Sequence, residues 1–109
     1  MTGPVFRTIA IRTDKSIEDV AVELREIFNA ESRNRDPFVG KQERNSMNYN
    51  GRYWLFGLLD DIEVVLMHSD DPGSLEIIID TTDFGFAEPL AAKLARVLFH
   101  RGYTVSVEN

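Results

Sequence analysis

The chain has 109 residues, a formal net charge of -6 and no cysteine. This length suits one domain with a core of its own, and the absence of cysteine excludes disulfides, thiolate nucleophiles and cysteine-ligated zinc. No stretch approaches the roughly 20 apolar residues of a membrane span, and the N-terminus lacks the pattern of a signal peptide. We therefore expect a single cytoplasmic domain over residues 1–109 that neither enters nor crosses a membrane.

The N-terminal part of the chain predicts a strand followed by a helix. β-branched and apolar residues dominate Val5–Arg12, which is typical of a strand. Apolar residues then recur at helical spacing between residues 17 and 28. Ser16 suits the N-cap because its hydroxyl can accept a free first-turn amide, and Glu18 and Asp19 complement the positive end of the helix dipole.

A polar stretch follows at about residues 30–51, where the helical periodicity ends. It is rich in asparagine and arginine and contains Asp36-Pro37, Gly40 and Asn50-Gly51. Structureless loops longer than about 12–15 residues are rare in compact domains unless they are functional or disordered. We expect a long loop with a mobile middle, which is either peripheral to function or in contact with a partner.

Three strands with short connections are expected next. Residues 52–59 and 62–69 are apolar runs separated by Asp60-Asp61, and residues 75–80 form a third run after Asp70-Asp71-Pro72-Gly73. Asp tolerates the left-handed conformation of tight hairpins, and Pro followed by Gly is a strong turn signal. These segments predict an antiparallel meander.

A second helix and a last strand complete the predicted fold. Apolar residues at helical spacing run from Ala87 to Leu98, with Pro89 placed in the first turn and Gly102 just past the end. Residues 103–107 read as a strand. The predicted fold is α+β, a mostly antiparallel sheet in the order β-α-β-β-β-α-β with two helices on one face.

Acidic residues are concentrated between Arg52 and Lys93, an interval without any lysine or arginine. Such a block repels a phosphate backbone, which excludes nucleic acid as the main ligand, and attracts a basic protein. The alternative is that the carboxylates only keep the protein soluble. The acidic residues expected to bind a partner are Asp60, Asp61, Glu63, Asp70, Asp71, Asp80 and Asp83.

The first meander strand is apolar on both of its faces. Trp54, Phe56 and Leu58 lie on one face, whereas Tyr53 and Leu55 lie on the other. Two helices can bury only one face of a sheet, so the long loop, a second copy of the chain or a partner must cover the other. In the last case an apolar patch rimmed by carboxylates docks the partner, and Trp54 is its exposed aromatic anchor.

Catalytic and metal-binding patterns are not found in the sequence. Asp83-Phe84-Gly85 matches a kinase motif over three residues only, and neither glycine-rich phosphate loop occurs. His68 and His100 are the only histidines, and neither belongs to a nucleophile motif or a metal-ligand pattern. We expect no enzyme activity, no catalytic residue, no metal and no cofactor.

Part of the chain resembles the immunity proteins of bacterial contact-dependent growth inhibition and related polymorphic toxin systems. The resemblance rests on Asn48-Tyr49-Asn50-Gly51-Arg52-Tyr53, Gly57-Leu58-Leu59, Ile62-Glu63-Val64-Val65-Leu66 and Asp70-Asp71-Pro72. Immunity proteins are small, cytosolic, often acidic, and share no universal motif, so no residue role is carried over. The resemblance implies that the chain binds one cognate toxin, usually a basic nuclease or other cytotoxic domain, and blocks its active site or access to substrate.

Two other classes of function remain open at this point. A small-molecule-sensing or regulatory domain requires an apolar pocket between helices and sheet or at a dimer interface. A small enzyme requires a concave site with strongly perturbed titratable groups. The sequence leaves the oligomeric state open between monomer and homodimer.

Overall fold

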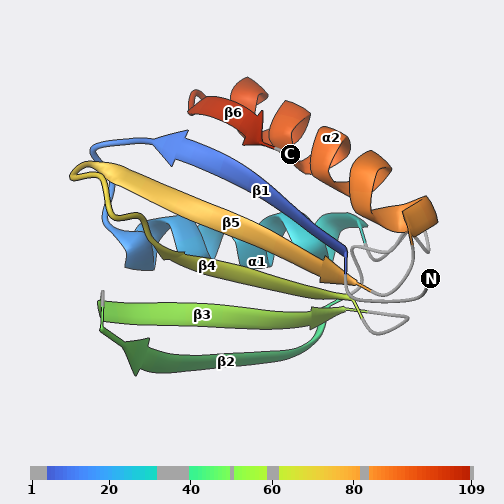
Figure 1. The fold of residues 1–109 in the computed structure, drawn as a ribbon, viewed down its shortest axis with the longest axis horizontal. Coiled ribbons are helices and arrows are strands. Elements are labelled where there is room, and N and C mark those ends of the chain that lie inside the picture. The colour runs from blue at the N-terminus through green and yellow to red at the C-terminus, as the bar shows by residue number, and fades with distance from the viewer. Residues whose placement is uncertain (1–4, 32–39, 50, 59–61, 82–83, 109) are drawn as a thin grey trace.

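The computed structural model describes residues 5–31, 40–49, 51–58, 62–81 and 84–108 (Figure 1). These residues form a six-stranded sheet in the order β2-β3-β4-β5-β1-β6, with every neighbouring pair antiparallel, and two helices. The expected α+β class is confirmed, and the observed order is β-α-β-β-β-β-α-β. The elements are β1 (Val5–Arg12), α1 (Ile17–Glu31), β2 (Gly40–Asn48), β3 (Gly51–Leu58), β4 (Glu63–His68), β5 (Ser74–Thr81), α2 (Phe84–His100) and β6 (Thr104–Glu108).

Strand β2 corrects the prediction of a loop at about 30–51. Gly40–Asn48 pairs along β3, with Asn45 opposite Trp54 and an irregularity near Gln42. β2 is an edge strand, and residues 43–47 are all exposed. Because neither of its faces is buried there, the strand shows no alternation of apolar and polar residues. The rest of the predicted loop up to residue 39 lies outside the described residues, apart from the end of α1.

Helices α1 and α2 pack on the same face of the sheet, where they enclose the core. Figure 1 shows α1 behind the strands, and the ion pair between Arg101 and Glu26 (3.7 Å) joins the end of α2 to α1. Phe28 of α1 packs edge-to-face on Phe56 of β3, with ring centroids 5.1 Å apart. The core also takes in the buried apolar residues of β1, β4 and β5, namely Ile9, Ile11, Val64, Leu66, Leu75, Ile77 and Ile79.

The helix ends follow from the sequence, with one correction. The Ser16 hydroxyl accepts a hydrogen bond from the Asp19 amide (3.2 Å), and Gly102 ends α2 with φ +97, so both predicted end signals are confirmed. The first-turn position predicted for Pro89 is wrong, because α2 begins at Phe84. Pro89 lies inside the helix, where its missing amide removes one backbone hydrogen bond.

Candidate functional site

The sheet face opposite the helices carries a band of partly exposed apolar side chains, which we call the open face. Leu55 of β3, Val65 of β4 and Ile78 of β5 are direct neighbours in register across three strands. All three are half-buried, and Tyr53 and Met67 lie on the same face with similar exposure. Because both described helices pack on the other face, no described helix covers this band.

Trp54 does not belong to the open face, and the prediction that it is an exposed anchor is wrong. Its side chain is only 6% exposed and belongs to the core, together with Phe56 and Leu58. The strand alternation was identified correctly, but the helices cover the Trp54 side of β3. The partly exposed aromatic residue of this strand is Tyr53, on the opposite face.

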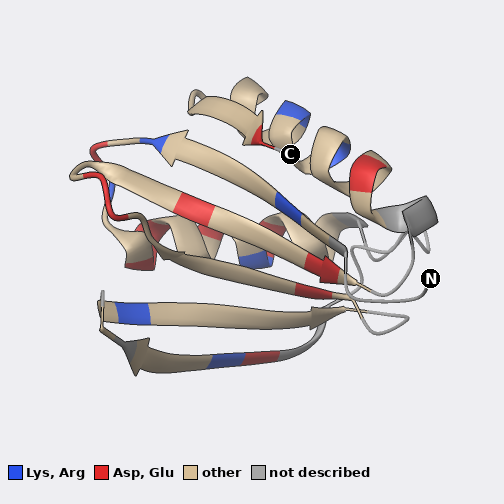
Figure 2. Ribbon diagram, viewed as in Figure 1, with Lys and Arg blue, Asp and Glu red and all other residues tan. Residues whose placement is uncertain are grey.

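Two predicted site residues, Glu63 and Asp80, face each other across β4 and β5 on the open face. The next residue in this row, on β1, is Phe6, which is directly opposite Asp80 and 52% exposed. Figure 2 shows acidic segments of β4 and β5 side by side at one end of the sheet, in agreement with this pairing. Neither carboxylate has a hydrogen bond or an ion pair among the described residues. Like charges in directly opposed positions destabilise a sheet.

Asp70 and Asp71, which the sequence also predicts to bind a partner, lie in the β4–β5 turn at the opposite end of the sheet. They border an open hollow of about 520 Å³, whose lining also includes Arg12, Glu76 and Glu108. Four carboxylates therefore surround the guanidinium of Arg12, and this excess of negative charge favours a positively charged ligand. From Ser74 to Asp80, strand β5 spans about 20 Å at roughly 3.3 Å per residue. The four described acidic residues of the predicted site thus form two separate pairs, and no single acidic cluster.

The remaining predicted site residues, Asp60, Asp61 and Asp83, lie outside the described residues. The sequence-based prediction placed Leu55 on this face of the strand but did not name it as a site residue. It missed several other open-face residues, namely Phe6, Arg12, Val65, Glu76, Ile78 and Glu108. The alternation along the strands could have identified them. Every second residue of β1, β4 and β5 is in the core, so the residues between them lie on the open face.

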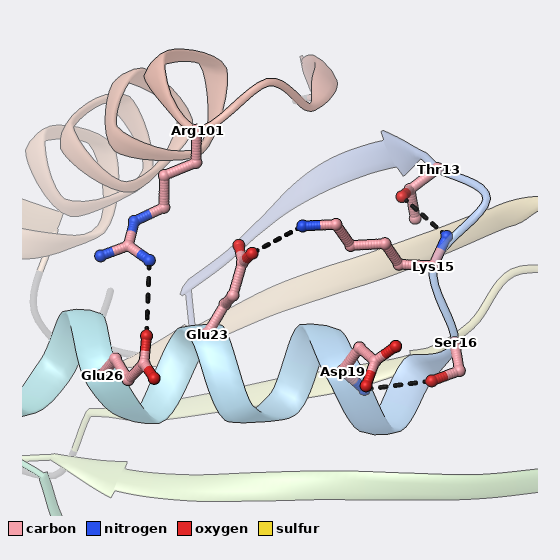
Figure 3. A network of polar contacts seen from close by, with 7 residues as sticks. All are labelled: Thr13, Lys15, Ser16, Asp19, Glu23, Glu26 and Arg101. Atoms are coloured by element: carbon pink, nitrogen blue, oxygen red, sulfur yellow. Dashed lines mark hydrogen bonds and ion pairs between the residues drawn. The ribbon is translucent and has the colours of Figure 1, made fainter.

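A polar network on the helix side joins the β1–α1 turn to α1 (Figure 3). The Lys15 ammonium donates a hydrogen bond to the Glu23 carboxylate (2.7 Å) and lies 4.9 Å from the centre of the Tyr103 ring. The hydrogen bond to Glu23 is the largest cause that raises the pKa of Lys15 above its ordinary value. These contacts fasten the turn and the start of β6 to α1.

Burial and charge compete at Glu23. Burial by itself raises its pKa, but the hydrogen bond from Lys15 and the other contacts outweigh burial, so the pKa lies below its ordinary value. Burial, reinforced by the nearby Glu23 carboxylate, raises the pKa of Tyr103. Glu23 Oε2 and the Tyr103 hydroxyl are buried, and neither atom reaches hydrogen-bond geometry to a partner among the described residues. This pair of polar groups lies on the far side of the sheet from the open face.

The described ranges show neither a cluster of metal ligands nor a membrane-spanning helix. No group of three or more His, Asp or Glu side chains there is arranged to hold a metal ion. His68 lies on the helix side of β4, beside Gly51 at the start of β3. Among the same residues, no helix has the length and apolar character needed to cross a membrane.

Comparison of the chain with models of protein families, with curated proteins and with solved structures finds no match.

Proposed function

We propose that this protein is an immunity protein that binds a cognate toxin through the open face of its sheet and thereby blocks the toxin's active site or its access to substrate. The observation that carries the proposal is the contiguous row Leu55, Val65 and Ile78, which no described helix covers. Apolar patches with charged margins are typical of protein-binding surfaces. The resemblance to immunity proteins supports the role of the partner as a toxin.

A protein partner fits the open face better than a small molecule does. Small-molecule sites are usually concave, largely apolar and enclose most of the ligand. The 520 Å³ hollow is lined mainly by polar residues, and Asp70, Asp71 and Glu108 at its margin are exposed. A small ligand there would stay in contact with water. The apolar row beside it, in contrast, offers an extended contact surface.

The charges on the open face favour a basic partner. Glu63 and Asp80 stand at one end, and the turn carboxylates Asp70 and Asp71 stand at the other. Carboxylates of this kind raise the association rate with a cationic protein and lose that effect as salt screens them beyond about 8 Å at physiological ionic strength. The net charge of -6 acts in the same direction. Many toxin domains of the resembled systems are basic nucleases.

The experiment compares two arginine substitutions of similar chemistry on opposite sides of the molecule. Ile78→Arg places a charge in the centre of the open face, whereas Val22→Arg places one on the exposed side of α1. A candidate toxin domain is sought in the reading frames beside this gene and produced with each variant in cells, and growth and affinity are measured. We expect Ile78→Arg to lose protection and Val22→Arg to retain it, with both variants folded by circular dichroism. Full protection by a folded Ile78→Arg variant would refute the open face as the binding surface.

A further inference from the structure

We infer that the open face binds its partner through an arginine side chain, seated over the row Glu63–Asp80–Phe6, with apolar partner side chains on the neighbouring row of Leu55, Val65 and Ile78. This inference rests on the proposed function, since it specifies the chemistry of the partner at the same surface. It goes further by assigning one partner residue type to one place on the sheet.

The register places two carboxylates and an aromatic ring side by side. Glu63 pairs with Asp80 across β4 and β5, and Asp80 pairs with Phe6 across β5 and β1. Neighbouring strands lie about 4.8 Å apart, so the row extends over roughly 10 Å. Glu63 and Phe6 are exposed, and Asp80 is half-buried between them. A side chain that approaches the face can therefore reach all three residues.

The combination of groups selects a cation. Two carboxylates in opposed positions repel each other, and among the described residues neither has a cationic partner to relieve the repulsion. A positive group placed between them removes the repulsion and gains hydrogen bonds to ionised acceptors. An exposed aromatic ring adds a favourable contact for a cation within about 6 Å of its centre.

Arginine fits the row better than lysine. Its guanidinium is planar, donates several hydrogen bonds in a fixed fork and stacks on aromatic faces, whereas the lysine ammonium is a compact and strongly hydrated charge. A guanidinium can thus bridge Glu63 and Asp80 while its flat side contacts Phe6. Its aliphatic stem would then lie towards Val65 and Ile78, the next pair on the same face of β4 and β5, each two residues from its neighbour in the row.

The arginine site is tested on the free protein with N-acetyl-arginine methylamide as the probe, by NMR titration of the backbone amides. The uncharged isostere N-acetyl-citrulline methylamide and the lysine analogue serve as controls. We expect saturable shifts at Phe6, Glu63 and Asp80, with affinity lowered at least about tenfold for citrulline because the uncharged probe cannot make charge-assisted hydrogen bonds. Lysine should bind more weakly than arginine.

Two variants separate a built site from general attraction to an acidic protein. Glu63→Gln/Asp80→Asn keeps the shape of the row but removes its charge, and Glu18→Gln/Asp19→Asn removes the same charge from the first turn of α1. We expect the first variant to abolish the arginine shifts and the second to preserve them. Shifts of equal size around Glu18 and Asp19, or shifts that survive in the first variant, would overturn the inference. A homodimer in which an arginine of the second copy fills the row would also overturn the inference. Sedimentation would then show a dimer, and the Glu63→Gln/Asp80→Asn variant would dissociate it.

The outcomes also separate this inference from the proposed function. If the arginine probe does not bind but the Ile78→Arg substitution abolishes protection from the toxin, the open face is the interface and only the assignment of a partner arginine is wrong. If the arginine probe binds at the row but the Ile78→Arg variant still protects cells, the arginine site is confirmed and the proposed function is wrong.

Discussion

The Lys15 ammonium and the Glu23 carboxylate lie 2.7 Å apart, where they tie the β1–α1 turn to the second turn of α1. Glu23 is the better shielded partner, with a side chain 20% exposed against 47% for Lys15. Because the folded state lowers the pKa of Glu23 and raises that of Lys15, the pair links stability to pH at both ends of the scale.

Glu23→Gln should reduce the free energy of unfolding at neutral pH, by a small amount because water screens the half-exposed Lys15. The contribution of a carboxylate with a lowered pKa is complete above its unfolded pKa of about 4.3 and is lost as pH falls through the folded value. The stability difference between wild type and variant, measured by urea unfolding, should therefore be constant between about pH 5 and about pH 10, where lysine begins to lose its charge, and shrink below about pH 4.3. Glu26→Gln is the control, since Glu26 is 63% exposed and 3.7 Å from Arg101. A pH-independent difference would contradict the role of the Glu23 charge.

Trp54→Ala should destabilise the protein by about 3–5 kcal/mol, the usual cost of removing a buried aromatic side chain. Its neighbour Tyr53 lies on the open face and is partly exposed, so Tyr53→Ala should cost clearly less. Urea unfolding of both variants measures the difference. If Tyr53→Ala proved the more damaging, the assignment of the two faces of β3 would be wrong.

The sequence predicts the strands that contribute to the core but not the strand that lies beside it. Alternation identifies β3, β4 and β5 because one side of each is buried, as at Phe56, Val64 and Ile77. β2 has the sequence GKQERNSMN and owes its conformation to pairing with β3 rather than to burial. Hydrophobic periodicity carries no information about such an edge strand.

The candidate site could be predicted only in part, for a related reason. Alternation separates Trp54 from Tyr53, but the side on which the helices pack depends on connections between distant segments. The pairing of Glu63 with Asp80 likewise depends on the register of β4 and β5, and a shift by one residue moves every side chain to the other face. The acidic composition was visible in the sequence, whereas the division into two groups at opposite ends of the sheet was not.

Glu63→Gln should stabilise the free protein, because it removes the repulsion from Asp80 across the β4–β5 ladder. Cross-strand charge pairs are worth about 0.2–1 kcal/mol, which sets the expected gain in the free energy of unfolding. Glu108→Gln is the control, since the residue directly opposite Glu108 in the ladder is Thr8 rather than a carboxylate. Asp80→Asn should give a similar gain, and the double variant should give less than the sum of the two. A loss of stability in Glu63→Gln at low salt would show that the carboxylate has a favourable partner.

Hydrogen exchange across residues 43–48 distinguishes an edge strand from a loop and from a covered edge. In an antiparallel edge strand, every second amide points to the neighbouring strand, and the amides between them point outwards. We therefore expect slow exchange to alternate with fast exchange along β2, in step with its pairing to β3. Uniformly fast exchange would mean that this segment is a loop in solution, as its polar sequence alone suggests. Uniformly slow exchange would mean that a second copy or another segment pairs with the outer edge. The alternation should persist when a partner binds at the proposed interface, because that interface is the open face and leaves the outer edge of β2 in water.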